Sequence, residues 1–221
     1  MISVVMPSYL GEYPNCATRR EERMQLAVSS FISQTNKDSE LIIISDGCDL
    51  TQKLYEDNYK GESRIKFDRL EKGVYFSGGP RNKGIEMSSG DLICYLDSDD
   101  FFGKKHLELI ESKFTIENDW GYFDDFFITR RLRSKHNIFL RRTVKITEPM
   151  RVGTCSIVHL RDLPVKWEDG YGHDHEFVKK LKIYPHKRMG VGEYYVCHIP
   201  IYDKYEDMEY DLDNRDYIIR Y

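Results

Sequence analysis

Strand-like and helix-like segments alternate through the first hundred residues, and this alternation restricts the chain to a small set of folds. The first apolar run ends at Pro7, and the run ELIIISDG at 40–47 ends in an Asp-Gly turn signal. The expected elements of this half are strands at 2–6, 40–47, 64–67 and 91–96 and helices at 24–32, 51–59 and 80–88. Strands that alternate with helices indicate a mainly parallel sheet with helices on its faces.

The pattern changes after a further helix expected at about 104–114. Strand-like runs then follow one another, which indicates antiparallel additions to the sheet. The remaining expected elements are strands at 121–129, 137–146, 154–159 and 193–199 and a helix at 175–183. The predicted fold class is therefore α/β, a mainly parallel central sheet flanked by helices with a smaller antiparallel C-terminal part. No linker rich in Gly, Ser or Pro divides the sequence, so we expect a single domain over 1–221.

Composition excludes several classes of protein. With 33 Lys and Arg against 37 Asp and Glu, the net charge of −4 does not suit a polycation that coats nucleic acid or membrane. The five cysteines are odd in number and form no CxxC pair, which argues against a disulfide framework and a zinc site. No run approaches the roughly 20 apolar residues of a membrane helix, and no signal peptide is visible. We expect a cytoplasmic protein, soluble or peripherally bound to a membrane, of unknown oligomeric state.

Charge is segregated in the C-terminal half. The stretch 129–145 holds seven basic residues and no acid, whereas the tail at 200–221 is acidic and contains five tyrosines. Two interpretations stay open. The two segments dock together or face water, or the basic stretch binds a polyanion.

Acidic residues follow two of the expected strands directly. Asp46 ends the second strand, and Asp97, Asp99 and Asp100 follow the fourth in CYLDSDDFF. Ligands of open α/β sheets bind beyond the carboxyl ends of the strands, so these acids should share one edge. Their hard oxygens suit Mg²⁺ or Mn²⁺, which takes one or two protein carboxylates and completes its shell with phosphate and water. Alternatively, Asp99 or Asp100 caps the helix expected to begin near Lys104.

Several spaced motifs resemble family 2 glycosyltransferases. GGPRNKGIEMSSGDLICYLDSDDFF at 78–102 is similar to the family segment in which an Arg-Asn-Gly helix precedes a Gly-Asp strand that ends in an Asp-x-Asp motif. VVMPSY, AVSSFISQT and ELIIISDGCDLT resemble the opening strand, the first helix and the second strand with its turn. Ser45 and Cys48 stand where the family often has Asp and Ser, and LGEYPNCATRREER resembles an insertion. The resemblance is strongest over 1–102.

This resemblance implies a glycosyltransferase A-type (GT-A) fold that binds a nucleotide sugar, with UDP as the expected nucleotide. Residues 1–102 would bind the donor, and residues 103–199 would form the acceptor and catalytic half. Carried over by position, Pro7 and Tyr9 would line the base pocket, and Asp46 would contact the base or ribose. Tyr9 could instead belong to the core.

The resemblance also implies roles near the diphosphate. Arg81 would support the nucleotide side, Asp97 would lie by the ribose and the metal, and Asp99 would ligate Mn²⁺ or Mg²⁺. Arg81 could instead simply pair with nearby acids. His198 is the expected late histidine ligand of the metal, against the alternative of a core histidine, and His186 is the competing candidate.

The segment WEDGYGHDHEFVKKL at 167–181 resembles the family's acidic motif at a helix start, with His173-Asp174 in place of a Glu-Asp pair. Asp174 therefore takes the position of the catalytic base. A carboxylate in a water-poor acceptor pocket has a raised pKa, which general-base work requires. Asp174 could instead be the N-cap of the helix at 175–183, and Glu168 and Asp169 are rival bases.

The acceptor is less defined. Trp167 is either an acceptor-stacking platform or a core residue. The basic stretch, with Arg141 and Arg142, could face a phosphate-bearing acceptor such as nucleic acid, a lipid-linked phosphate or an anionic polysaccharide, through contacts that weaken with salt.

The sequence thus predicts a metal-dependent, inverting glycosyltransferase that moves a sugar from a nucleoside diphosphate to an acceptor hydroxyl. One alternative is a sugar nucleotidyltransferase, which would carry a Gly-rich phosphate loop after the first strand, whereas PSYLGEYPN offers only Gly11. The other alternative is a catalytically silent nucleotide-sugar-binding protein, which the replacement of Glu by His173 keeps open.

Overall fold

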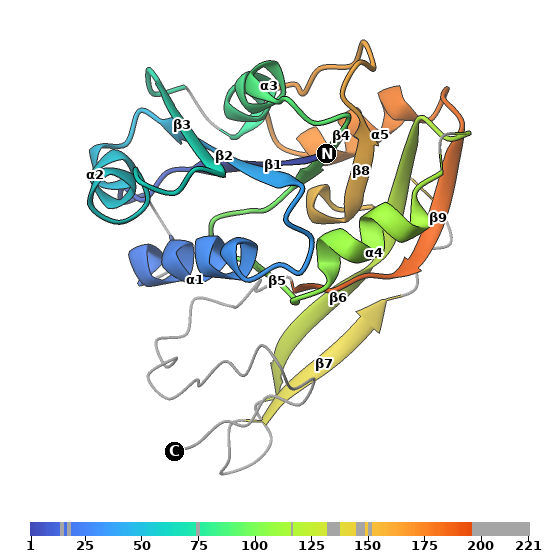
Figure 1. The fold of residues 1–221 in the computed structure, drawn as a ribbon, viewed down its shortest axis with the longest axis horizontal. Helices are drawn as coiled ribbons and strands as arrows, with labels where there is room; N and C mark the ends of the chain where they lie inside the picture. Colours follow the sequence, from blue (N-terminus) through green and yellow to red (C-terminus); the bar gives the residue numbers. More distant parts are fainter. Residues whose placement is uncertain are drawn as a thin grey trace.

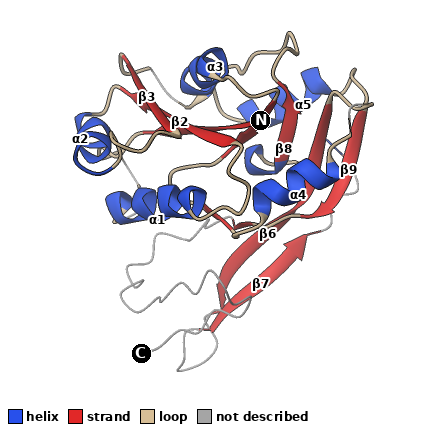
Figure 2. Ribbon diagram, viewed as in Figure 1, coloured by secondary structure: helices blue, strands red, loops and turns tan. Residues whose placement is uncertain are grey.

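An eight-stranded sheet with helices on both faces organises the chain (Figure 1). The computed structural model describes residues 1–13, 16, 19–73, 76–115, 117–131, 138–144, 149 and 152–195, with the backbone alone for 125–131, 138–144 and 195. The strand order is β3-β2-β1-β4-β8-β6-β7, and β9 pairs with β6. Figure 2 shows the helices and strands of this arrangement.

The N-terminal half is the expected parallel unit. Its elements are β1 (Ile2–Ser8), α1 (Arg20–Ile32), β2 (Ser39–Asp46), α2 (Asp49–Asn58), β3 (Ile65–Leu70), α3 (Gly78–Met87) and β4 (Leu92–Tyr95). β1 pairs in parallel with both β2 and β4, and β2 pairs in parallel with β3. The prediction of alternating strands and helices in this half is confirmed.

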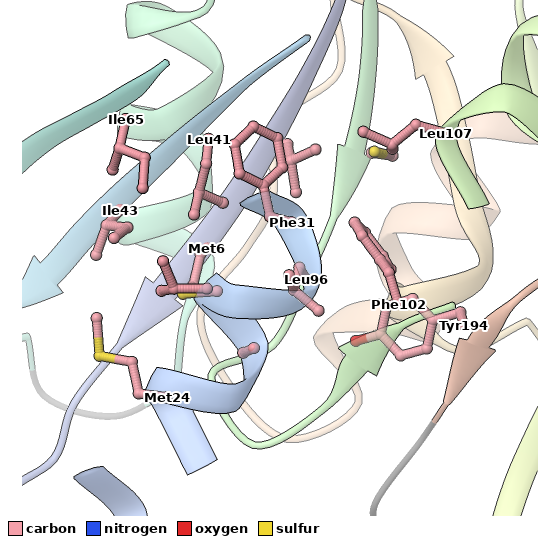
Figure 3. Packing of buried hydrophobic residues seen from close by; sticks show 14 of the residues in the cluster. Met6, Met24, Phe31, Leu41, Ile43, Ile65, Leu96, Phe102, Leu107 and Tyr194 are labelled. Atoms are coloured by element: carbon pink, nitrogen blue, oxygen red, sulfur yellow. The ribbon is translucent and has the colours of Figure 1, made fainter. Parts of the chain in front are cut away.

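Side chains of the central strands alternate between two cores, as the pleat of a strand requires. Val4 and Met6 of β1 belong to the cluster that contains the apolar faces of α1 and α4 (His106–Lys113). Val5 belongs to the opposite cluster, which contains Phe177 and the rest of the apolar face of α5 (His173–Leu181). Figure 3 shows the first cluster, with Met24 and Phe31 of α1 packed on the sheet. Both faces of β1 are thus buried, which explains its continuous apolar run.

The C-terminal half adds mostly antiparallel strands. They are β6 (Trp120–Arg131), β7 (Ile138–Val144), β8 (Ile157–Leu160) and β9 (His186–Val191). β8 lies antiparallel between β4 and β6, and β7 pairs antiparallel with the far end of β6. The prediction of antiparallel additions is confirmed for these strands. β9 was missed, because HKRMGV has no apolar run, and it pairs parallel to β6.

Two short strands join distant parts of the chain. β5 (Phe101–Phe102) and β10 (Tyr194–Tyr195) form an antiparallel ribbon next to the acidic turn at 97–100. Phe102 and Tyr194 pack in the cluster of Figure 3. The strand expected at 193–199 is described only as β10, and the tail at 200–221 lies outside the described residues.

The expected strand at 154–159 begins as a 3-10 turn at Thr154–Ser156 before β8. Cysteines 16, 48, 94 and 155 are free thiols. Within the described ranges, no helix has the length and apolar character needed to cross a membrane.

Candidate functional site

Three strand ends meet at one edge of the sheet. Ser8 of β1 pairs with Ser45 of β2, and Val5 of β1 pairs with Tyr95 of β4, so the three strands end side by side. Tyr9 follows β1, Asp46 is the last residue of β2, and Asp97 follows β4 closely. Parallel strands therefore bring the residues expected for the donor to a common edge.

Asp46 is held by a segment that the sequence did not single out. Its carboxylate is 6% exposed and accepts hydrogen bonds from Lys72 Nζ and, at 2.9 Å, from the Gly73 N–H. Gly47 has a φ of +68°, and a Cβ there would lie 2.5 Å from Lys72 N, so glycine is needed for this approach. The sequence marked Asp46-Gly47 as the end of the strand, but nothing local identified Lys72 as the partner of Asp46.

Tyr9 extends the same cluster. Lys72 Nζ lies 4.5 Å from the centre of the half-buried Tyr9 ring, a cation–π distance. Arg20 donates hydrogen bonds to the carbonyls of Tyr9 and Gly11 and so fixes the turn after β1. Pro7 is buried within β1, paired with Ile44. An aromatic face with an anion and a cation beside it can stack on and hydrogen-bond to a heterocyclic base.

The acidic turn at 97–100 is fixed from the C-terminal side. The Tyr194 hydroxyl donates to Asp100 Oδ2 at 2.8 Å and accepts from the Asp97 N–H at 3.1 Å. The expectation that Asp99 or Asp100 caps the next helix is wrong, because α4 begins at His106 and its N-cap residue makes no side-chain capping bond. Asp100 is buried under Tyr194, whereas Asp97 is partly exposed and Asp99 is exposed.

These carboxylates fit a divalent cation in part. Asp97 and Asp99 offer hard oxygen donors at the strand edge, which is the one-or-two-carboxylate set that Mg²⁺ uses together with phosphate oxygens. Among the described residues, no group of three or more His, Cys, Asp or Glu is arranged to hold a metal by itself. His198, the other expected ligand, lies outside the described residues. Asp97 and Asp99 could supply protein ligands to such a cation, and their role in metal binding stays a prediction.

Arg81 connects the acidic turn to α5. It is 3% exposed, and its Nη2 donates to Asp97 Oδ1 at 2.8 Å. Its Nη1 donates to Ser77 Oγ and, at 2.8 Å, to His173 Nε2. Its Nε is buried and, within the described part of the chain, has no hydrogen-bond acceptor. The alternative that Arg81 pairs with the acidic cluster is thus present in the structure, and a role in supporting the nucleotide stays a prediction.

Asp174 lies in the first turn of α5. The alternative that it caps this helix is wrong, because the helix begins at His173 and Gly172 is the N-cap residue. Its partly exposed carboxylate accepts from the His175 N–H at 2.9 Å. Of the rival bases, Glu168 is paired with Lys180 at 2.6 Å, and that contact lowers the pKa of Glu168, opposite to what a base requires. The catalytic role of Asp174 stays a prediction.

The second rival base, Asp169, accepts a hydrogen bond from the Gly79 N–H at the start of α3, at 3.2 Å. It therefore helps to hold the loop before α5 against α3. A carboxylate is a favourable contact for the N–H groups at a helix N-terminus. This position suits a structural contact better than proton abstraction.

Trp167 belongs to the core. Its ring is 3% exposed and stacks on Phe177 with centroids 3.8 Å apart, so a role as an exposed platform for an acceptor is wrong for this structure. Its Nε1–H donates to Tyr95 Oη at 2.9 Å, and Tyr95 Oη lies 2.6 Å from His159 Nε2. Asn82 of α3 exchanges two 2.9 Å hydrogen bonds with the backbone of Trp167. These contacts fix the loop that leads to α5.

Exposed aromatic rings lie instead around His173. Tyr171 is 97% exposed two residues before α5, and Phe76 is 45% exposed with its ring centre 5.9 Å from that of His173. Phe76 also has a φ of 68°, which non-glycine residues rarely adopt. Sequence reasoning passed over both residues, because an isolated aromatic residue in a loop carries no periodic signal.

The basic stretch is described only as backbone. Arg141 and Arg142 pair with Ile128 and Phe127 across the β6–β7 hairpin, which extends away from the body of the sheet (Figure 1). Their side chains lie outside the described set, so their predicted contact with an acceptor stays a prediction.

Comparison with known proteins gives one family. The family model described as "Glycosyl transferase family 2" matches residues 3–163. The chain is 31% identical over 109 residues to poly(ribitol-phosphate) beta-N-acetylglucosaminyltransferase TarP of Staphylococcus aureus, which covers 48% of this chain and 31% of TarP. It is 30% identical over 131 residues to the amylovoran biosynthesis glycosyltransferase AmsB of Erwinia amylovora, which covers 57% of this chain and 39% of AmsB. The chain thus spans well under half of these relatives.

Among solved structures, TarS of S. aureus (residues 1–349) in complex with UDP-GlcNAc superimposes with a TM-score of 0.67 at 17% identity. The match covers 92% of this chain and 59% of that one. At such identity the likeness establishes the fold alone, and it agrees with the α/β fold predicted from the sequence.

Proposed function

The chain belongs to glycosyl transferase family 2, and from this premise we propose that it transfers a sugar from a nucleoside diphosphate to an acceptor hydroxyl with inversion at the anomeric carbon. One observation carries the proposal. The carboxylates expected to bind the donor lie at one strand edge, and Arg81 links that edge to the helix that bears the expected base. A donor and an acceptor bound on either side of Arg81 would meet between Asp97 and Asp174.

UDP is the proposed nucleotide. The TarS structure that shares this fold holds UDP-GlcNAc, and the cluster of Tyr9, Asp46 and Lys72 offers a ring face and both hydrogen-bonding charges to a base. Asp46 would accept from a base N–H, and Lys72 would move aside or donate to a base carbonyl.

Transfer needs a base for the acceptor and stabilisation of the leaving diphosphate. Asp174 would accept the proton of the acceptor hydroxyl as that oxygen bonds to the anomeric carbon. The bond from that carbon to the diphosphate oxygen would break at the same time, and its electron pair would leave with the diphosphate. Asp97 and Asp99, with His198 as a further candidate, would hold Mn²⁺ or Mg²⁺, which supplies Lewis-acid stabilisation of the departing charge.

Tyr195 supports this candidate role of His198. It is the last described residue and pairs with Phe101, directly after the acidic turn. At most about 10 Å of extended chain separates Tyr195 from His198, and the role of His198 as a ligand stays a prediction.

A phosphate-bearing acceptor is the proposed acceptor class. The names of two relatives point to such acceptors: TarP, and a GalNAc(5)-diNAcBac-PP-undecaprenol beta-1,3-glucosyltransferase of Campylobacter jejuni that is 27% identical over 100 residues. The basic stretch at 129–145 would supply the cations, and acceptor binding should then weaken with added salt.

A thermal-shift panel tests the donor assignment. The panel measures Tm with each of four compounds, UDP, UDP-GlcNAc, UDP-glucose and GDP-mannose, in the presence of Mn²⁺ or of EDTA. A compound that binds the folded chain raises Tm, because a ligand at 100 times its Kd stabilises the fold by about 2.7 kcal/mol. We expect UDP and a UDP-sugar to raise Tm with Mn²⁺, and Asp46→Asn to remove the shift. If none of the four compounds raises Tm with Mn²⁺, the proposal fails. Release of sugar from the donor then separates an enzyme from a silent binding protein.

A further inference from the structure

Side-chain hydrogen bonds of Arg81 run from the acidic turn to α5. The guanidinium presents its N–H groups in a fixed fork, so the direction of one bond sets the directions of the others. Nη2 points to Asp97 and Nη1 to His173, both at 2.8 Å, while the Trp167 ring lies under the guanidinium at 4.9 Å. Loss of the His173 contact would leave Nη1 held by Ser77 Oγ alone and so weaken the constraint that keeps this fork on Asp97.

The proton positions on His173 follow from its partners. Arginine cannot accept a hydrogen bond, so Nε2 of His173 must be the acceptor and the ring proton resides on Nδ1. Nδ1 then donates to the Gly170 carbonyl at 3.1 Å. His173 is therefore a neutral acceptor for Arg81.

The surroundings of His173 favour the neutral ring. Burial, and then the Arg81 charge, lower its pKa, against raising contributions from the Gly170 carbonyl, Asp174 on its own helix and Asp97 on the acidic turn. The rings of Phe76 and Trp167 complete its described surroundings. Because His173 is neutral, Asp97 is the charged partner of the Arg81 guanidinium in this contact. A carboxylate at position 173 would compete with Asp97 for the guanidinium.

We propose that His173 is a positioning residue for the donor site. By accepting from Arg81 it keeps the guanidinium on Asp97 and ties the donor carboxylate to the first turn of α5, one residue from Asp174. The role in donor binding rests on the proposed function, whereas the hydrogen-bond relay does not.

The relay is tested first without ligand. Histidine ¹⁵N NMR should show His173, assigned by its loss in His173→Gln, with a protonated Nδ1 and a hydrogen-bonded, unprotonated Nε2. Asp97→Ala should shift the Nε2 signal, because Arg81 loses its partner. Asp162→Ala, at an exposed surface acid, is the matched control and should leave the signal in place. A protonated Nε2, or a signal indifferent to Asp97→Ala, overturns the inference.

Donor binding is tested next, with UDP-GlcNAc and Mn²⁺ by calorimetry. We expect His173→Phe, which removes the acceptor nitrogen, to weaken binding roughly tenfold, the size of one lost hydrogen bond to a charged group. His173→Gln, which restores an acceptor, should stay within about twofold to threefold of wild type at pH 7.5. The exposed neighbour His175 gives the control His175→Phe, which should bind like wild type.

The pH dependence separates positioning from a general structural role. Protonation of His173 removes the acceptor, so wild-type affinity should fall as the pH drops through the lowered pKa of His173, and His173→Gln should lack this acid limb. Equal affinity of His173→Phe and His175→Phe, or an unchanged acid limb in His173→Gln, overturns the inference. Failure of the wild type to bind UDP-GlcNAc would overturn the proposed donor instead, and the ligand-free NMR result would stand on its own.

Discussion

Lowering the pH from 7 to 5 should destabilise the fold through two buried histidines. His159 is 1% exposed and accepts from Tyr95, while its Nδ1–H donates to the Leu160 carbonyl at 2.7 Å. His106 is 1% exposed, stacks on Phe102 and accepts from the Glu193 N–H at 3.1 Å. Burial lowers the pKa of His159 to about 4, and burial together with the Lys113 charge lowers that of His106 to about 3. Both rings are neutral in the fold.

The size of the effect follows from proton linkage. The ordinary histidine pKa is 6.5, so at pH 5 the unfolded chain binds a proton at each site that the folded chain does not. The free energy of unfolding therefore keeps its full value above pH 6.5. It falls as the pH drops from 6.5 toward the folded-state pKa of each ring. At about 1.4 kcal/mol per pH unit, each histidine should lower the free energy of unfolding by about 2 kcal/mol at pH 5. This value changes little if the folded-state pKa lies anywhere well below 5.

Urea denaturation followed by circular dichroism at pH 7 and pH 5 measures this loss. Wild type should lose about 4 kcal/mol through the two sites, and His159→Gln and His106→Gln should each lose about 2 kcal/mol less over the same interval, whatever their stability at pH 7. His175→Gln, at an exposed position, is the control and should leave the pH difference as in wild type. An identical pH difference in wild type and both variants would refute the assignment of neutral buried rings.

Three further predictions concern the site and its supports. Asp174→Asn should lower the rate of sugar transfer by a factor of about 10²–10⁴ and leave donor affinity unchanged, because it removes the general base alone. Transfer kinetics measure the rate and calorimetry measures the affinity. A normal rate would exclude Asp174 as the base. Asn82→Ala should lower the free energy of unfolding by about 1–3 kcal/mol, because the Trp167 backbone loses two partners; Asn82→Asp, which can still accept from the Trp167 N–H, should lose less. Gly84→Ala should cost about 1–3 kcal/mol by denaturation, because its new Cβ would overlap Val5; a stabilised variant would mean that α3 can shift freely.

The central strands β1, β2 and β4 could be predicted because they are buried on both faces. β2 (Ser39–Asp46) is buried along its whole length, so its apolar pattern is visible without knowledge of its neighbours. The rule that parallel strands end at one edge then placed Asp46 and Asp97 at the same edge of the sheet. β9 shows the opposite case. It is held by its pairing with β6 and exposes its basic side chains, so hydropathy gave no signal.

The supports of the site could not be predicted because each depends on a distant partner. Asp100 is a residue type favoured as a helix cap. Its carboxylate instead accepts a hydrogen bond from Tyr194, 94 residues further along the chain. Lys72 reaches Asp46 across 26 residues, and Asn82 reaches Trp167 across 85. A local pattern identifies residue types suited to a role, whereas contacts that form only in the folded chain decide which role each takes.

The α3 helix contacts both halves of the chain. Two adjacent residues of α3 bind different segments. Arg81 hydrogen-bonds to Asp97 and His173. Asn82 hydrogen-bonds to the backbone of Trp167. Gly84 on the same helix allows close contact with Val5 at the centre of the sheet. The packing of α3 on the sheet therefore sets the positions of Asp97 and of the loop that leads to α5. A substitution that lifts α3 should weaken donor binding and slow transfer together, whereas loss of the base should slow transfer alone.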